Sequence, residues 1–304
     1  MRVFVAGATG VLGTAAVRAL VAGGHKVTAI GRTPDKRAAL AAFGATPVEA
    51  DLFDPDSLRR AVAGHDVVVN LATRVPAPSA AMRAKSWREN DRVRSQAARN
   101  LAEAAGQEGV SRLIQEAVSY VYEDGGDEWI TERQRVRANA FSASSLVATE
   151  NAMAFADAYR FAVVLRLGLV YGDEPGTRWQ LDRVRRGKPA VIGDAQGYMS
   201  PITVEDTGAA VVAALAAPSG VYNVSGPPLT RGDWAAELGL AAGIGRPARF
   251  YPPLATRLVA KRIEPFLRSQ RISSDSFHNA TGWRAKTAVH EGLAQIPPPA
   301  APAR

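Results

Sequence analysis

The sequence predicts an α/β protein in which a doubly wound parallel sheet is joined by a smaller lobe near the C-terminal end. Three observations support this fold class. Short apolar runs alternate with helical patterns up to about residue 172, which is typical of consecutive βαβ units. The alternation then breaks into shorter elements. The length of 304 residues suits one large domain with a smaller addition.

The first three strand–helix units are predicted from apolar runs that are followed by helix start and stop signals. A glycine pair ends the first helix, and the second helix has proline in its first turn and glycine at its end. Asp54 and Pro55 open the third helix. The expected strand and helix pairs are 2–7 with 11–24, 26–31 with 34–44, and 45–50 with 54–64.

The remaining strands of the sheet are expected between residues 66 and 172. The run DVVVNLA (66–72) has three consecutive valines, as in a strand that is buried on both faces. A long helical pattern over 82–106 precedes a strand and its exit loop at 111–122. A second helix over 142–159 precedes the apolar strand 161–172.

The change of pattern after residue 172 also predicts the domain boundaries. Residues 1–172 are expected to form the main domain, and 201–220 are expected to return to it. The short elements in 173–200 and 221–295 are expected to form the small lobe. The proline-rich segment 296–304 is expected to be a flexible tail.

The composition excludes several classes of site. The chain has no cysteine, which excludes disulfides, thiolate metal sites and cysteine nucleophiles. Its four histidines are not spaced as metal ligands, so no metal is expected. We find neither the pattern of a signal peptide nor an apolar run near the ~18 residues of a membrane span. These features predict a cytoplasmic protein without a membrane partner.

The net charge of +8 does not by itself indicate nucleic-acid binding. A nucleic-acid site would need basic residues gathered on one element, with aromatic residues between them. The arginines are instead scattered along the chain, as in DRVRSQAARN and LDRVRRGK. A solvated basic surface is the expected explanation. A basic pocket for an anionic cofactor would account for part of the excess.

The segment GATGVLG (7–13) places glycines between the first strand and the first helix. Such a loop lets the chain turn sharply, lets backbone N–H groups approach a pyrophosphate, and brings the helix close to the strand. Its place in an N-terminal βαβ unit predicts a Rossmann-type dinucleotide-binding domain, although a purely structural turn is the alternative. The expected pyrophosphate-binding residues are Gly7, Thr9, Gly10, Val11, Leu12 and Gly13.

The ends of the next strands predict the rest of the cofactor site. Arg32 follows the second strand, where an acidic residue would bind a free ribose hydroxyl, so NADP(H) is favoured over NAD(H). The alternative for Arg32 is a solvated basic turn. Asp51 is expected either to accept a hydrogen bond from adenine or to cap the next helix. The remaining expected contacts with the nucleotide are Leu52, Leu71, Ala72 and Thr73.

Further motifs follow the later strands. Together with the glycine loop they resemble the extended short-chain dehydrogenase/reductase family, the NAD(P)-dependent epimerase/dehydratase group, over nearly the whole chain. The resemblance implies an NAD(P)-binding oxidoreductase fold. The matching segments are DLFD (51–54), NLA (70–72), VY (121–122), LRLGLVYG (165–172), TVEDTGAAVVAAL (203–215), GVYNVSG (220–226) and TGW (281–283).

The resemblance also implies a catalytic tyrosine and lysine that this sequence lacks. In the family a Tyr-x-x-x-Lys pair follows the fifth strand, with a glutamate commonly four residues after the lysine. Aligning on Glu150 puts Leu146 at the lysine position and Ser142 at the tyrosine position. Residues 133–158 contain neither tyrosine nor lysine. The family's tyrosine-based proton transfer is therefore not expected here.

Other groups near the end of the fifth strand are candidates for the missing role. The family serine falls at Val118, one residue from Ser119. Tyr120 is a candidate proton donor, as is Tyr122, whose position is usually structural in the family. Ser119 and Ser142 are candidate hydrogen-bond donors to a substrate carbonyl. The arginines considered for an acidic substrate, with a solvated surface as the alternative, are Arg74, Arg133, Arg135 and Arg137.

The substrate and the assembly are predicted only coarsely. Four lobe residues favour an apolar or aromatic small molecule over a free sugar, although such residues commonly form a core. The helices at 82–106 and 142–159 permit a homodimer, as is often seen in the family. The four residues are Trp179, Tyr198, Met199 and Trp234.

Three functions remain open from the sequence. The leading hypothesis is an NADP(H)-dependent oxidoreductase that acts on a small carbonyl or hydroxyl substrate through a non-standard proton relay. Orientation beside the substrate supplies ~7–11 kcal/mol in favourable cases, whereas an absent relay costs only ~10²–10⁴-fold. The alternatives are a non-catalytic NADP(H) sensor and a non-redox isomerase or cyclase that reuses the pocket.

Overall fold

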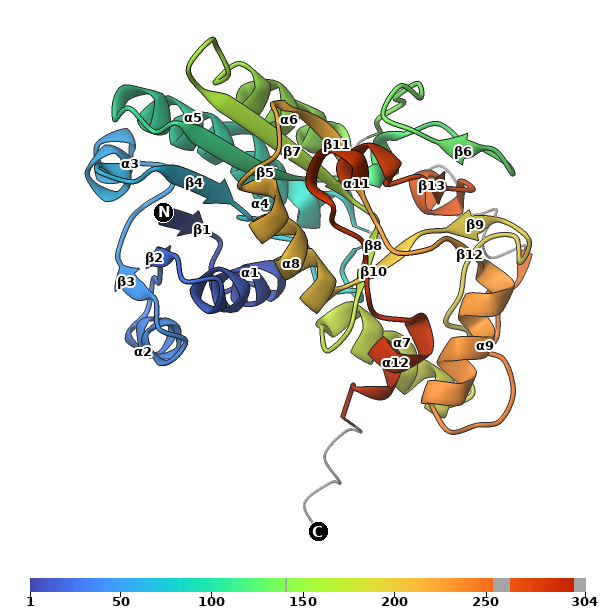
Figure 1. Cartoon of the computed structure of the whole chain (residues 1–304). Helices are drawn as coiled ribbons and strands as arrows, with labels where there is room; N and C mark the ends of the chain where they lie inside the picture. Colours follow the sequence, from blue (N-terminus) through green and yellow to red (C-terminus); the bar gives the residue numbers. More distant parts are fainter. Residues whose placement is uncertain (82, 140, 254–262, 298–304) are drawn as a thin grey trace.

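The structure is a computed structural model that describes residues 1–81, 83–139, 141–253 and 263–297. Its centre is a seven-stranded parallel sheet with the strand order β11-β7-β5-β4-β1-β2-β3 (Figure 1). The fold class is therefore as predicted. The strands are β1 (Arg2–Ala6), β2 (Lys26–Ile30), β3 (Thr46–Val48), β4 (Val67–Asn70), β5 (Arg112–Val118), β7 (Phe161–Leu167) and β11 (Gly220–Val224).

Helices cover both faces of the sheet, because alternate residues of each strand point to opposite sides. Val3 and Val5 pack into one core cluster, and Phe4 and Ala6 pack into another. The first cluster includes residues of α1 (Val11–Ala22), α2 (Pro34–Ala42), α8 (Val204–Ala214) and α11 (Asp275–Thr281). The second includes residues of α3 (Pro55–Val62), α5 (Ala98–Gln107) and α6 (Ala143–Met153).

The helix expected at 82–106 contains a wide turn in its middle. The helical run comprises a 3₁₀ turn η1 (Ala84–Trp87), α4 (Arg88–Arg92), a π-helical turn η2 (Val93–Ala97) and α5. Arg94 lies on the π turn and is buried, with its Nη2 2.5 Å from Oε1 of Glu116 on β5. The sequence pattern over 82–106 did not predict this turn, because a π-helical turn has no simple sequence signal.

The small lobe has its own core beside one end of the sheet (Figure 1). Its helices are α7 (Pro175–Arg185), α9 (Arg231–Ala241) and α12 (Val289–Ala294). Three two-stranded sheets lie outside the main sheet. They are formed by β8 (Leu169–Tyr171) with β10 (Pro201–Thr203), β9 (Tyr198–Met199) with β12 (Leu229–Thr230), and β6 (Trp129–Ile130) with β13 (Arg271–Ile272).

Two parts of the chain lie differently from the expected lobe boundaries. The strand β11 pairs with β7 in the main sheet, so residues 221–224 lie in that sheet. Phe277 of α11 and Trp283, which were expected in the lobe, pack into the core cluster that α1, α2 and α8 form on one face of the main sheet. Ile296, expected in the flexible tail, is buried in the core of the lobe, and residues 298–304 lie outside the described residues. Pairing and burial of this kind depend on distant neighbours that local sequence does not reveal.

Candidate functional site

The glycine loop lies between β1 and α1 and is packed too closely for side chains. Gly7 has φ +76°, and a Cβ there would lie 2.5 Å from the amide nitrogen of Ala72. A Cβ on Gly13 would lie 2.1 Å from the carbonyl oxygen of Gly7. Gly10 begins α1 without a side-chain cap, which leaves the first N–H groups of the helix available to an anion. This geometry fits a pyrophosphate.

The end of β4 lies directly beside this loop. Ala6 pairs with Asn70, and the N–H of Leu71 donates to the carbonyl of Ala6. The side chain of Asn70 accepts from the N–H of Ala72 and donates to Gln115 on β5. The strand order reverses between β1 and β4, which is where nucleotides bind in open α/β sheets. Leu71 and Ala72 are buried at this point, and the neighbouring Thr73 is half-buried.

Arg32 lies exposed just beyond the end of β2. No hydrogen bond or ion pair engages its side chain within the described ranges, so the guanidinium is available to a phosphate. The neighbouring Arg37 is engaged, because its Nη1 donates to the carbonyl of Gly31 and lies 3.3 Å from Oε2 of Glu49. The basic turn therefore contains one engaged and one available arginine.

Asp51 does not cap the helix that follows it. Its Oδ1 accepts from the N–H of Phe53, whereas Asp54 caps α3 by accepting from the N–H groups of Asp56 and Ser57. The capping alternative for Asp51 is therefore wrong, because the turn places Asp54 at the N-cap position. The exposed Asp51 and the half-buried Leu52 precede this cap, and the adenine contact stays a prediction.

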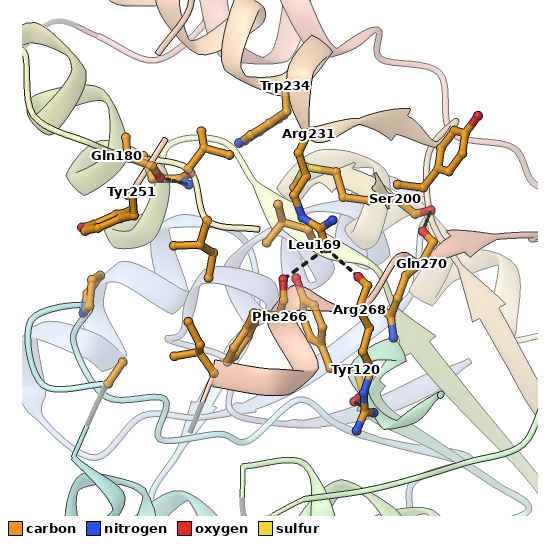
Figure 2. Close-up of a pocket in the computed structure, with 18 of the residues that line it drawn as sticks. Tyr120, Leu169, Gln180, Ser200, Arg231, Trp234, Tyr251, Phe266, Arg268 and Gln270 are labelled. Atoms are coloured by element: carbon orange, nitrogen blue, oxygen red, sulfur yellow. Dashed lines mark hydrogen bonds between the residues drawn. The ribbon is translucent and has the colours of Figure 1, made fainter. Parts of the chain in front are cut away.

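A cavity of about 570 Å³ lies between the carboxyl end of β5 and the small lobe (Figure 2). Trp179, Tyr198, Met199 and Trp234, which the sequence singled out, all line it. Most of its other lining is also apolar. The remaining lining residues are Pro78, Ser79, Ala81, Ser119, Tyr120, Leu169, Gln180, Ala190, Val191, Ile192, Ser200, Arg231, Tyr251, Ile263, Phe266, Arg268 and Gln270.

Ser119 and Tyr120 bring the end of β5 into this cavity. The hydroxyl of Ser119 donates to Oε1 of Gln270, whose Nε2 donates back to the carbonyl of Ser119. The ring of Tyr120 packs against Phe266 with centroids 4.9 Å apart. Its hydroxyl makes no hydrogen bond to any described residue. Burial raises the pKa of Tyr120 well above its usual value of 10.0, which makes this phenol a weaker acid.

Tyr122 and Ser142 lie elsewhere. Tyr122 is fully buried, and its hydroxyl donates to Oδ1 of Asn223 at 2.7 Å and accepts from Nη1 of Arg166 at 2.8 Å. These contacts give Tyr122 a structural role, and it is not among the residues that line the cavity. Ser142 is buried at the start of α6, where its hydroxyl oxygen accepts from the N–H of Asn139.

Two buried arginines in the cavity wall, Arg231 and Arg268, were missed by the sequence reasoning. Arg268 forms an ion pair with Glu264, with 2.6 Å between Nη2 and Oε2. Among the described residues Arg231 donates only to backbone carbonyls, and burial lowers the pKa of its guanidinium. The sequence could have pointed to Arg231, because it is three residues before Trp234 and the two therefore share one face of α9. The arginines proposed from the sequence do not line the cavity.

The comparisons with known proteins agree with this geometry. The profile of the NAD dependent epimerase/dehydratase family matches residues 3–225. A 3-diazoavenalumate denitrifying reductase from a Streptomyces species is 30% identical over 303 residues, which cover 93% of this chain and 96% of that protein. The chain therefore belongs to the NAD dependent epimerase/dehydratase family and is an NAD(P)-dependent enzyme.

Other relatives are more distant. A 2-alkyl-3-oxoalkanoate reductase from Stenotrophomonas maltophilia is 25% identical over 293 residues, covering 88% of this chain and 84% of that protein. Among solved structures, the UDP-glucose 4-epimerase of Thermotoga maritima with UDP-glucose superposes with a TM-score of 0.80 at 18% identity, covering 97% of both chains. The MoeE5 complex with UDP-glucose and NAD has a TM-score of 0.77 at 22% identity, also with 97% coverage of both. These two structures support the fold.

The structure also bears on metals and membranes within the residues it describes. No three His, Cys, Asp or Glu side chains in these ranges gather where they could hold a metal ion. None of the helices that are described there has the length and apolar character needed to cross a membrane.

Proposed function

We propose that the protein is an NADP(H)-dependent reductase of a small aromatic substrate whose reduction needs no proton from a tyrosine. The observation that carries this proposal is the cavity at the end of β5. Aromatic side chains from the lobe line it, and Ser119 and Tyr120 lie where the nicotinamide end of the site is expected. The absence of tyrosine and lysine from residues 133–158 supports the second half of the proposal.

The cofactor would be held by the loop and strand ends described above. The first N–H groups of α1 would bind the pyrophosphate, Arg32 the 2′-phosphate, and Asp51 the adenine. Leu71, Ala72 and Thr73 would pack against the nucleotide at the end of β4. When bound, the nicotinamide supplies a hydride. Arg32 supports NADP(H) over NAD(H), because a guanidinium pairs with a phosphate and no carboxylate engages it among the residues described.

The kind of group that accepts the hydride is inferred from the catalytic tyrosine and lysine that the chain lacks. Reduction of a carbonyl creates an alkoxide that needs a proton, whereas reduction of an aryl diazonium does not. In the second case the C–H bond forms with the hydride electrons, and the C–N bond breaks as N₂ leaves with its electron pair. The name of the Streptomyces relative indicates this class of substrate. We therefore propose a diazo-bearing aromatic molecule as the substrate.

The chain's own groups would bind and orient this substrate. The aromatic walls would pack against its ring and exclude water. Ser119 is held in place by Gln270, and Tyr120, whose hydroxyl makes no hydrogen bond to a described residue, lines the same cavity. Both would therefore orient the reacting group by hydrogen bonds. Ser142 is a weaker candidate for this role, because it is buried at the start of α6 outside the cavity lining.

The proposal is tested by label transfer from NADPH deuterated at C4, on each face in turn. With 3-diazoavenalumate, we expect one deuterated face alone to give ring deuterium, together with N₂ release. Equal labelling from both faces would indicate the spontaneous reaction and contradict the proposal. Turnover of a 2-alkyl-3-oxoalkanoate in its place would support a carbonyl reductase. Tight NADPH binding without labelling of either substrate would contradict the reductase function.

Two finer expectations are also part of the proposal. A homodimer would form through α5 and α6, and a mass measurement in solution tests it. A cytoplasmic location is tested by fractionation of the host cell. The sensor hypothesis has less support than the reductase, because the family and the similar reductases are enzymes.

A further inference from the structure

Arg231 is the one buried charged residue of the cavity wall that forms no ion pair within the described part of the chain. It is the first residue of α9 and is 4% exposed. Two glycines make room for its guanidinium, since a Cβ on Gly197 would lie 2.1 Å from Nη1 and a Cβ on Gly193 would lie 3.2 Å from Nε. Figure 2 shows the side chain extending from α9 toward Phe266 and Arg268.

Arg231 forms no ion pair with any carboxylate in the described part of the chain. The charges of Asp124 and Asp194 act on its guanidinium without contact, and burial still lowers its pKa. Nη2 donates to the carbonyls of Phe266 and Arg268 at 3.2 and 2.5 Å, and Nη1 reaches the carbonyl of Asp194 at 3.5 Å. Its Nε–H has no acceptor within the described ranges. The other arginine in the cavity, Arg268, is already neutralised by Glu264 through two short contacts. The cavity wall therefore holds one guanidinium that no described carboxylate contacts, and a carboxylate of a ligand can pair with it.

Trp234 supplies a second observation at the same place. It lies one helical turn after Arg231 on α9, lines the cavity and is 1% exposed. Its Nε1–H is buried and has no acceptor among the described residues. A buried donor of this kind normally has a partner, so an acceptor oxygen on a ligand is the natural candidate. Trp234 and Arg231 descend from the same helix toward the cavity (Figure 2).

We propose that Arg231 and Trp234 form a subsite for the carboxylate of an aromatic acid, while the apolar walls hold the aromatic part. This inference rests on the proposed function and specifies the substrate class for the same cavity. A carboxylate carries one charge and two acceptor oxygens, which match one guanidinium and one indole N–H. The diphosphate of a nucleotide sugar carries more charge than this single guanidinium neutralises.

The test measures binding to the cofactor-free protein, so that it does not depend on turnover. Cinnamate and its neutral amide are titrated by calorimetry at pH 7. We expect the acid to bind about tenfold or more tightly, because charge-assisted hydrogen bonds to a buried guanidinium are strong. Arg231→Met should remove this preference while the amide binds as before. Arg231→Lys should keep part of this preference, because the positive charge remains but the bidentate hydrogen bonding of the guanidinium is lost.

Controls separate this subsite from folding and from the reductase function. Arg135→Met, at an 83% exposed side chain, should leave the preference unchanged. Trp234→Phe should weaken binding of the acid more than binding of the amide. Equal binding of acid and amide by the wild-type protein would overturn the proposal, as would tight UDP-glucose binding that Arg231→Met abolishes.

The wild-type comparison of acid and amide decides the proposal even if Arg231→Met fails to fold. NADPH binding and thermal unfolding of each variant show whether it is folded. Deuterium transfer without any preference for acids would refute the subsite and leave the reductase function standing. A preference for acids without deuterium transfer would support the subsite and refute the reductase function.

Discussion

Gly7 lies directly against the backbone of Ala72, so that a Cβ at position 7 would come within 2.5 Å of the Ala72 amide nitrogen. This contact joins the loop after β1 to the end of β4, at the point where the strand order reverses. Because the contact is between backbones, no side-chain movement can relieve an added methyl group. The cofactor loop and the end of β4 therefore pack backbone against backbone.

Gly7→Ala should consequently damage the loop more than a comparable glycine substitution elsewhere. Gly24 is the matched control, since it has φ +77° and no heavy atom within 4 Å of an added Cβ. Both variants lose ~1–2 kcal/mol from the left-handed backbone conformation. Gly7→Ala should lose a further ~1–3 kcal/mol from overpacking. Denaturant unfolding and NADPH titration test this, and equal behaviour of the two variants would contradict it.

Arg32→Ala should weaken NADPH binding by about ten- to a hundredfold and leave NADH binding nearly unchanged, because a charged hydrogen bond contributes ~1.5–3 kcal/mol. Arg37→Ala removes the same charge from the same turn. Its guanidinium is engaged by Gly31 and Glu49, so its effect on the ratio of the two affinities should be smaller. Fluorescence titration with both cofactors decides this. A parallel loss of both affinities in Arg32→Ala would refute the phosphate contact.

Tyr120→Phe tests whether the cavity uses a tyrosine as its acid. Burial raises the pKa of Tyr120, so the phenol stays neutral between about pH 6 and 9 and should not titrate in the rate profile. If its hydroxyl only orients the substrate, kcat/KM should fall less than about tenfold. Loss of a proton donor would instead cost ~10²–10⁴-fold and would contradict the proposed electrophile.

The buried Arg94–Glu116 pair should be strongly coupled. Both side chains are 4% exposed, and Nε of Arg94 and Oε2 of Glu116 have no partner within the described residues. Arg94→Met should cost ~3–5 kcal/mol of unfolding free energy, because it leaves a buried carboxylate unpaired. Arg94→Met combined with Glu116→Gln should recover much of that loss. Additive effects in this double-mutant cycle would show that the pair is not coupled.

Glu116 should also make the stability of the protein depend on pH. Burial outweighs the attraction of Arg94 and raises the pKa of Glu116 above its usual 4.5. The folded state then binds the proton more tightly than the unfolded state. The resulting stabilisation is complete below the usual pKa and is lost as pH rises through the raised one. Glu116→Gln should lack this decline, so its unfolding free energy relative to wild type should increase with pH across that window.

Local sequence was sufficient for features that depend on neighbouring residues. The loop glycines 7 and 13 lie where close packing requires them, and Asp54 caps α3 as predicted. Backbone conformation and capping act over a few residues, which is why their signals can be read directly.

Contacts between residues that are far apart in the sequence could not be predicted in this way. Nothing near residue 220 indicates that β11 pairs with β7, and nothing near Tyr122 indicates its contacts with Asn223 and Arg166. The contact between Arg231 and the carbonyl of Arg268 joins segments 37 residues apart. Such pairs form when distant segments fold together, so their residue types carry no local pattern.

The sequence by itself determined the parallel sheet and the glycine loop, because they follow from periodicity and from short-range geometry. Its resemblance to the family implied the nicotinamide cofactor. Only the tertiary structure decided which side chains share the cavity. It separated Tyr120, which lines the cavity, from Tyr122, which is buried in a hydrogen-bond network. It also brought the guanidinium of Arg231, which forms no ion pair among the described residues, into an apolar cavity, because burial and charge pairing depend on all the segments that surround a residue.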